Sequence, residues 1–175
     1  WFAMLRDVEE RDEEAIDLFL RSMELDPLGR IPYTNLPMLY VQRGQNDEAI
    51  RLWLEAMQIH PEWPMPQQYL ATHLAGLGRL DEAVAWGAQA SALSDDPAAG
   101  FLNVRLYLAL GDKEKAVALL EELPADHPFT ALMEGFLLLI DSDYRQALEF
   151  FSSIMDSGEY RRNTQFLPFV AAEVA

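Results

Sequence analysis

One spacing dominates this sequence, because a block of residues recurs every 34 positions. The same alanine stands in three blocks, as Ala15, Ala49 and Ala83, each 34 residues from the next. Gly44 and Gly78 precede the second and third alanine at that same interval. Each block closes on a proline, and these are Pro27, Pro61 and Pro97. A fixed period of this length indicates stacked copies of one small supersecondary unit.

Two further copies follow at shorter intervals. Gly111 and Ala116 belong to the segment GDKEKAVALL, and Ala147 belongs to SDYRQALEFF. The intervals from Ala83 to Ala116 and from Ala116 to Ala147 are 33 and 31 residues. The later copies have therefore lost residues, and the repeat degenerates toward the end of the chain.

Each copy is predicted to form two helices. In the second copy, a first helix runs roughly over residues 33–43 and ends at Gly44, because glycine accepts the left-handed conformation found at helix ends. Asn46 or Asp47 is expected to cap a second helix, and His60 before Pro61 is expected to end it. This second helix has an apolar stripe at helical spacing, formed by Ala49, Ile50, Trp53, Ala56 and Met57. The third copy follows the same plan, and no alternating strand-like run is present.

These positions divide the chain into six predicted segments. They are a partial first repeat over 1–29, repeats over 30–63, 64–97, 98–127 and 128–161, and a terminal helix of an incomplete repeat over 162–175. The acidic cluster over residues 9–14 is expected to be the solvated start of the second helix of the first repeat.

The pattern resembles the tetratricopeptide repeat, whose units combine a bulky residue, a small residue, aromatics, an alanine and a proline at fixed places. The second copy carries this likeness through Tyr33, Leu36, Tyr40, Ala49, Trp53 and Pro61. The fifth copy carries it through Gly135, Leu138, Tyr144, Ala147 and Phe151. Two positions depart from the family pattern, because Pro37 replaces a small residue and Gly87 replaces a large ring. The resemblance implies an all-α solenoid of helix-turn-helix repeats wound into a right-handed superhelix.

In this family, the first helix of each repeat lines a concave face that binds peptides or partner helices. Carried over position by position, the resemblance implies a protein-binding face of eleven residues, namely Thr34, Met38, Val41, Gln42, Gln68, Tyr69, Thr72, Phe101, Arg105, Leu132 and Phe136. The Lys, Arg and Asn clamp that some members use for acidic peptides is absent, since Thr34, Met38, Gln68 and Thr72 occupy its places. This face would form a groove for a partly hydrophobic segment.

Alternatives stay open at several of these positions. Met38, Phe101 and Phe136 also fit ordinary packing between helices, because apolar residues at helical spacing commonly belong to a core. Arg105 could meet a partner carboxylate or an acidic residue of its own chain. Pro37 deletes one backbone hydrogen bond inside a predicted helix, so that helix either begins late, near Asn35, or is kinked.

Charge and composition exclude several classes of partner. The chain has 29 acidic and 13 basic residues, a net charge of −16, which repels nucleic acid and anionic lipid. We therefore expect no nucleic-acid partner and no membrane contact by this segment. The longest apolar run, over residues 129–140, is short for a membrane helix and includes Glu134. The absence of cysteine fits the cytosol, which is favoured, or the periplasm if a parent protein has a membrane anchor.

No constellation of catalytic or metal-binding residues is recognisable. The three histidines, His60, His73 and His127, lack the spacing of a helical metal pair. Asp141 and Asp143 lie in a segment that lacks the glycine and closing glutamate of a calcium loop, so they are expected to cap a helix. We therefore expect neither cofactor, metal nor enzymatic activity.

Three functional hypotheses follow. The first is a non-enzymatic protein-interaction module. The second is a regulatory or sensory domain of a larger bacterial signalling or transcription-regulator protein. It is suggested because several sequence segments resemble the repeat tails of membrane-anchored winged-helix regulators and nucleotide cyclases. The third is a self-assembly element, because the incomplete ends leave apolar residues without an internal partner and predict a weak homodimer through the terminal helices. These apolar residues include Phe2, Leu5, Phe166, Phe169 and Val170.

Overall fold

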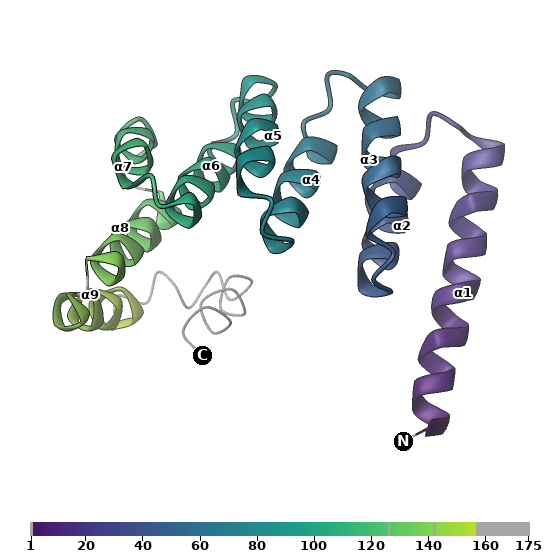
Figure 1. Cartoon of the computed structure of the whole chain (residues 1–175), viewed down its shortest axis with the longest axis horizontal. Coiled ribbons are helices and arrows are strands. Elements are labelled where there is room, and N and C mark those ends of the chain that lie inside the picture. Colours follow the sequence, from purple (N-terminus) through teal and green to yellow (C-terminus); the bar gives the residue numbers. More distant parts are fainter. Residues whose placement is uncertain (1, 126, 142, 157–175) are drawn as a thin grey trace. The chain divides into compact units, whose positions relative to one another are not determined.

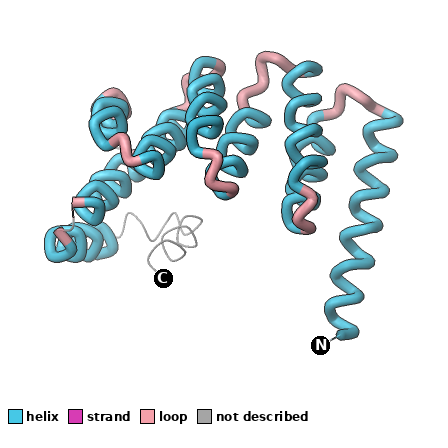
Figure 2. The backbone as a smooth tube through the Cα atoms, viewed as in Figure 1, coloured by secondary structure: helices cyan, strands magenta, loops and turns pink. Residues whose placement is uncertain are grey.

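All regular elements in the described part of the chain are helices, as Figures 1 and 2 show. The structure is a computed structural model that describes residues 2–125, 127–141 and 143–156. Its helices are α1 (Phe2–Leu25), α2 (Arg30–Gln42), α3 (Asn46–Ile59), α4 (Met65–Gly76), α5 (Leu80–Ala92), α6 (Pro97–Leu110), α7 (Lys113–Glu121), α8 (Pro128–Ile140) and α9 (Tyr144–Asp156). The predicted all-α class is therefore confirmed.

The chain divides into two compact parts, and the division falls inside α6. The N-terminal part is Trp1–Leu102, and the C-terminal part is Asn103–Ala175. In the N-terminal part, α2 packs against α3 and α4 packs against α5, while α1 contacts α2 and α3 contacts α4. In the C-terminal part, α8 packs against α9.

A glycine in the left-handed conformation separates the two helices of three pairs. The φ angles are 73° at Gly44, 75° at Gly78 and 85° at Gly111. Only glycine adopts these angles without steric strain, so the chain reverses at these residues. In each turn, the residue after the glycine donates its backbone N–H to the carbonyl five residues earlier, and the donors Gln45, Arg79 and Asp112 lie 2.8, 2.9 and 2.9 Å from their acceptors.

The repeated alanines lie where two helices cross. Ala49, Ala83, Ala116 and Ala147 are all completely buried. A side chain no larger than a methyl group lets the two backbones approach closely, and each helix then buries its apolar stripe.

Larger side chains fill the space around these crossings. The core of the N-terminal part contains Tyr33, Leu36, Leu52 and Ala56, with Ile16, Phe19 and Met23 of α1 packed against it. Burial, followed by the nearby Glu55 carboxylate, raises the pKa of Tyr33 to about 12. The protonated hydroxyl of Tyr33 donates to Glu55 Oε1 at 3.2 Å, so this buried polar group has a partner.

In the C-terminal part, a glycine in α8 makes room for an aromatic ring of α9. A Cβ atom added at Gly135 would lie only 2.3 Å from the nearest ring carbon of Phe151. The same ring contacts Phe136 edge to face, with the ring centroids 6.1 Å apart. The packing of α8 on α9 therefore requires glycine at position 135.

Several local predictions are wrong. α2 runs without a break from Arg30 to Gln42, so it does not begin late near Asn35. Pro37 lies inside it and is buried, and its missing N–H leaves the Tyr33 carbonyl without its helical donor. α3 begins at Asn46 itself, after Gln45, and neither Asn46 nor Asp47 occupies the capping position. Asp143, by contrast, does cap α9, since it accepts the Gln146 N–H at 3.1 Å.

The first repeat also differs from its prediction. α1 is one helix from Phe2 to Leu25, so the acidic cluster over residues 9–14 lies within it and does not start a helix. Position 10 corresponds to Gly44 one period later, and it is Glu10 that stands there. Without a glycine the helix continues through this position. The predicted segment 162–175, with Phe166, Phe169 and Val170, lies outside the described residues, as do the side chains of Phe2 and Leu5.

The requirement for glycine at position 135 can be tested by substitution. Gly135→Ala should lower the free energy of unfolding by about 1–3 kcal/mol, because the new methyl group overlaps the Phe151 ring. Gly76→Ala is the matched control, since a Cβ at this helical glycine has no neighbour within 4 Å. Adding Phe151→Leu to Gly135→Ala should recover part of the loss. Equal denaturant midpoints for Gly135→Ala and Gly76→Ala would contradict this account of the crossing.

Candidate protein-interaction face

The predicted residues of the N-terminal part, apart from Phe101 on α6, lie on two neighbouring first helices, α2 and α4, which are in contact. On α2, Thr34, Met38 and Val41 recur at helical spacing and therefore share one face, with Gln42 beside them. Met38 and Gln42 are exposed, and Thr34 and Val41 are half-buried. Met38 is therefore not a core residue, and this face of α2 is open to a partner.

Two exposed apolar residues extend this face beyond the prediction. Ile31 lies one helical turn before Thr34 on α2, and Met65 lies one turn before Gln68 on α4. Both are exposed, as is Thr72. The signal was present in the sequence, because these residues continue the same helical faces toward the start of each helix. We call Ile31, Thr34, Met38, Met65, Gln68 and Thr72 the α2–α4 face.

The hydroxyl groups of this face are already used as donors. Thr34 Oγ1 donates to the Arg30 carbonyl at 3.1 Å, and Thr72 Oγ1 donates to the Gln68 carbonyl at 2.8 Å. These bonds leave the hydroxyl lone pairs as acceptors for a ligand. The side-chain amides of Gln42 and Gln68 supply both donors and acceptors.

The start of α2 and the loop before it contact the loop that leads from α3 to α4. The Arg30 guanidinium lies over the Trp63 ring, 5.2 Å from its centroid, and forms an ion pair with Glu62. His60 Nε2 lies 2.9 Å from the Leu28 carbonyl oxygen. These contacts fix the first turn of α2, which carries Ile31 and Thr34.

Tyr69 packs between α3 and α4. Its ring stacks on the ring of Trp53 in α3, with the centroids 6.3 Å apart. His73, one turn later on α4, also contacts Trp53, at 5.5 Å between ring centroids. Tyr69 is half-buried in the packing of α3 on α4, so its main contact is with the core and not with the middle of an open groove.

The remaining predicted residues do not extend this face. Phe101 and Leu132 are buried, with 3% and 6% of their surface exposed, which fits the packing alternative for Phe101. Phe136 is half-buried against Phe151. Arg105 is half-buried and already has an interaction of its own. Leu132, Phe136 and Arg105 belong to the C-terminal part of the chain.

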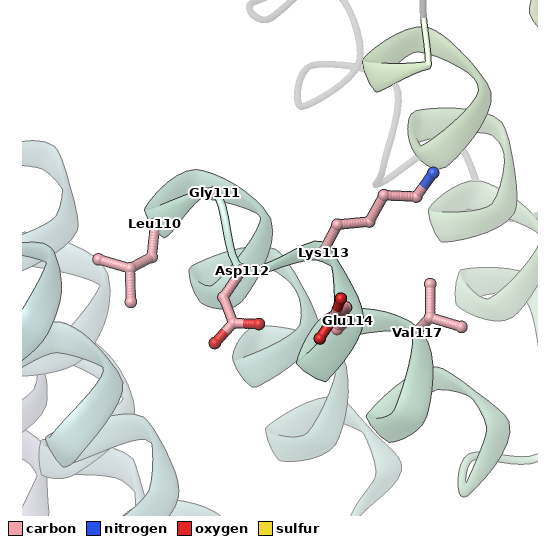
Figure 3. A pocket seen from close by; sticks show the side chains of 6 residues that line it. All are labelled: Leu110, Gly111, Asp112, Lys113, Glu114 and Val117. Atoms are coloured by element: carbon pink, nitrogen blue, oxygen red, sulfur yellow. The ribbon is translucent and has the colours of Figure 1, made fainter.

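An open hollow surrounds the turn between α6 and α7. Figure 3 shows its six lining residues, which are Leu110, Gly111, Asp112, Lys113, Glu114 and Val117. Lys113 reaches away from the two carboxylates, and its ammonium group donates to Asp141. Asp112 accepts the Lys115 N–H at 3.1 Å as the cap of α7. Both groups are thus engaged in holding helix ends.

Among the residues that the structure describes, no group of three or more His, Asp or Glu side chains is placed to hold a metal ion. None of the helices in the described ranges combines the length and apolarity that crossing a membrane requires.

The family comparison identifies the repeat. The model of the tetratricopeptide repeat family matches residues 69–86 and 97–122, which include most of α4, the first half of α5 and all of α6 and α7. A search of curated protein sequences finds no significant match.

Solved structures share the fold along most of the chain. MamA superposes with a TM-score of 0.67 at 15% identity, over 90% of this chain and 95% of its own. YrrB, described as a TPR protein with an unusual peptide-binding site, gives 0.60 at 15% identity, over 79% and 73%. Yeast Tom70 gives 0.70 at 21% identity, over 97% of this chain and 38% of its own. The predicted resemblance to the tetratricopeptide repeat is confirmed, and the fold that the chain shares with these structures is an all-α solenoid.

His73 couples the packing of α4 to pH. Burial, and to a smaller extent the positive charge of Arg79, lowers the pKa of His73. Its Nε2 atom is buried and has no hydrogen-bond partner among the described residues. The folded state therefore holds fewer protons on this ring than the unfolded state does, and stability rises with pH.

We predict that the contribution of His73 to stability is complete above about pH 6.5, the pKa of an unperturbed histidine, and is lost as pH falls below it. The melting temperature of the natural protein should fall more between pH 7 and pH 5 than that of His73→Gln. The variant is necessary because acidification also relieves the repulsion of a chain with a net charge of −16. Parallel pH profiles of the two proteins would contradict the prediction.

Proposed function

We propose that this chain is a non-enzymatic protein-interaction module and that the α2–α4 face binds a peptide or a partner helix. The observation that carries the proposal is the exposed apolar row of Ile31, Met38 and Met65 on two adjacent first helices. Threonine and glutamine side chains border this row. An apolar centre with a polar border is the usual composition of a protein-binding surface.

The binding mechanism is non-covalent and uses a preformed surface. The Arg30–Trp63 contact and the stacking of Tyr69 on Trp53 hold α2 and α4 in place before any ligand arrives. A surface that is already ordered loses little conformational freedom on binding, so more of the contact energy appears as affinity.

The composition of the face selects the chemistry of the ligand. Ile31, Met38 and Met65 would bury an apolar anchor, and methionine adapts its flexible side chain to differently shaped partners. Gln42, Gln68 and the acceptor lone pairs of Thr72 would pair with the backbone of an extended segment. The net charge of −16 disfavours a strongly acidic ligand. The expected ligand is therefore a protein segment with an apolar anchor and few acidic residues.

The fold comparisons support this proposal in general terms. YrrB has the same fold and is described as having a peptide-binding site. The rival location is the outer face formed by second helices, where Leu54 of α3 is exposed to almost the same extent as Met38, at 37% against 39%.

A peptide display library provides the test, because no ligand has to be known beforehand. Peptides selected on the natural protein should share an apolar anchor. Met38→Ala should weaken their binding about tenfold, the effect of losing a contact worth about 1.4 kcal/mol at the centre of an interface. The affinities are measured by calorimetry, and circular dichroism checks that each variant is folded.

Leu54→Ala is the matched control, since it truncates an equally exposed apolar side chain on the other kind of helix. It should leave the affinity unchanged. Full-strength binding to Met38→Ala and Ile31→Ala, with weakened binding to Leu54→Ala, would move the site to the outer face. Selected peptides without an apolar anchor would contradict the proposed ligand chemistry.

A further inference from the structure

In the next repeat, α3 is covered on one face by α2. Among the described residues, no helix covers the corresponding face of α1. Shifted by 34 residues, Ala15, Leu18 and Ser22 of α1 correspond to Ala49, Leu52 and Ala56 of α3. These residues occupy equivalent positions of the repeat in the two helices. A difference in their exposed fractions therefore shows whether a neighbouring helix covers them.

The exposures differ sharply. Leu52 is 1% exposed, whereas Leu18 is 69% exposed. Ala49 and Ala56 are fully buried, whereas Ala15 is half-buried and Ser22 is exposed. Leu52 and Ala56 are covered because they cluster with Tyr33 and Leu36 of α2, the first helix of their own repeat.

The adjacent face of α1 already has its partner. Ile16, Phe19 and Met23 pack against the core that α2 and α3 form. α1 is thus packed on one side only. A second face contains Ala15, Leu18 and Ser22 and continues to the exposed Leu25. The equivalent face of α3 packs against α2. We call these four residues the open face of α1.

The straight course of α1 explains why this face is open. The equivalent of Gly44 is Glu10, and the helix passes through it without a turn. The residues before position 10 therefore continue along the helix axis and do not fold back over Ala15 and Leu18. A first helix of this repeat is not formed by the described residues.

We infer that the open face of α1 binds the same face of a second copy, with the two α1 helices antiparallel and crossing near Leu18. Small residues at positions 15 and 22 allow close approach, as the alanines do at the crossings inside the chain. The exposed leucines would supply the apolar contact. A two-fold arrangement places each face against itself, so one surface serves both copies.

Charge complementarity favours a second copy in this orientation. Glu14 and Arg21 are both exposed and lie seven residues apart on the same border of the open face. In an antiparallel pair centred near Leu18, Glu14 of one copy lies beside Arg21 of the other, and symmetry forms the pair twice. This inference does not depend on the proposed function of the α2–α4 face.

Sedimentation equilibrium over a range of concentrations tests the dimer. The mass of the full chain should rise with concentration from 19.9 kDa toward twice that value. Leu18→Glu should keep the monomer mass at every concentration, while Leu148→Glu should not affect the dimer. Leu148 is the matched control because it is another helical leucine with 69% exposure, on α9. A monomeric natural protein, or a dimer that survives Leu18→Glu, would overturn the inference.

Charge reversal tests the antiparallel orientation. Glu14→Arg places two arginines together at each border and should weaken dimerisation, and so should Arg21→Glu, which places two glutamates together. The double variant Glu14→Arg with Arg21→Glu should restore dimerisation. Failure of the double variant to recover would overturn the antiparallel arrangement.

Disulfide trapping gives a second readout without a change of charge. The chain contains no cysteine, so a single introduced thiol reports only its own position. Under mild oxidation, Leu18→Cys should form a covalent dimer within minutes and Leu148→Cys should stay monomeric. Equal and slow cross-linking of both variants would indicate random collision and would overturn the proposed contact.

Discussion

The close crossing of two helices at a small residue is the constraint on which the rest of this structure depends. Ala49, Ala83, Ala116 and Ala147 are fully buried at corresponding positions of four helix pairs. Gly135 carries the same requirement further, because the ring of Phe151 occupies the space of its absent side chain. Close crossing brings the apolar stripes of the paired helices together and leaves the remaining faces free for neighbouring helices or for partners.

The features that could be predicted from the sequence are those that demand a particular residue. A left-handed turn needs glycine and a close crossing needs alanine or glycine, so Gly44, Gly78 and Ala49 gave the helix pairs directly. Capping residues are only preferences, and the prediction failed there, since α3 begins without Asn46 or Asp47 at its cap position. The acidic cluster that includes Glu10 was wrongly predicted to start a helix. The absence of a glycine at position 10 indicates a continuous helix, just as a glycine there would indicate a turn.

The candidate face was predictable as a helical face but not as an exposed surface. Met38 and Phe101 are both apolar residues that the family resemblance assigns to the concave face, yet Met38 is exposed and Phe101 is buried. Helical spacing gives the direction of a side chain along its own helix, whereas burial depends on how neighbouring helices pack. Ile31 and Met65 were not predicted, because they belong to the same helical stripes but lie outside the family's binding positions. The stacking of Tyr69 on Trp53 could not be predicted, because Trp53 lies on a different helix.

The order of contacts in the N-terminal part has a consequence for how this chain folds. Each of its first four helices packs on the next one, from α1 and α2 through to α4 and α5, and α2 also reaches α4. Contacts between segments close in sequence need little loop closure, which places such chains among the faster-folding proteins. Opening of an end helix breaks only one boundary, so α1 can separate while α2–α5 stay assembled. Local opening and global unfolding are therefore distinct events in this molecule, with separate rates.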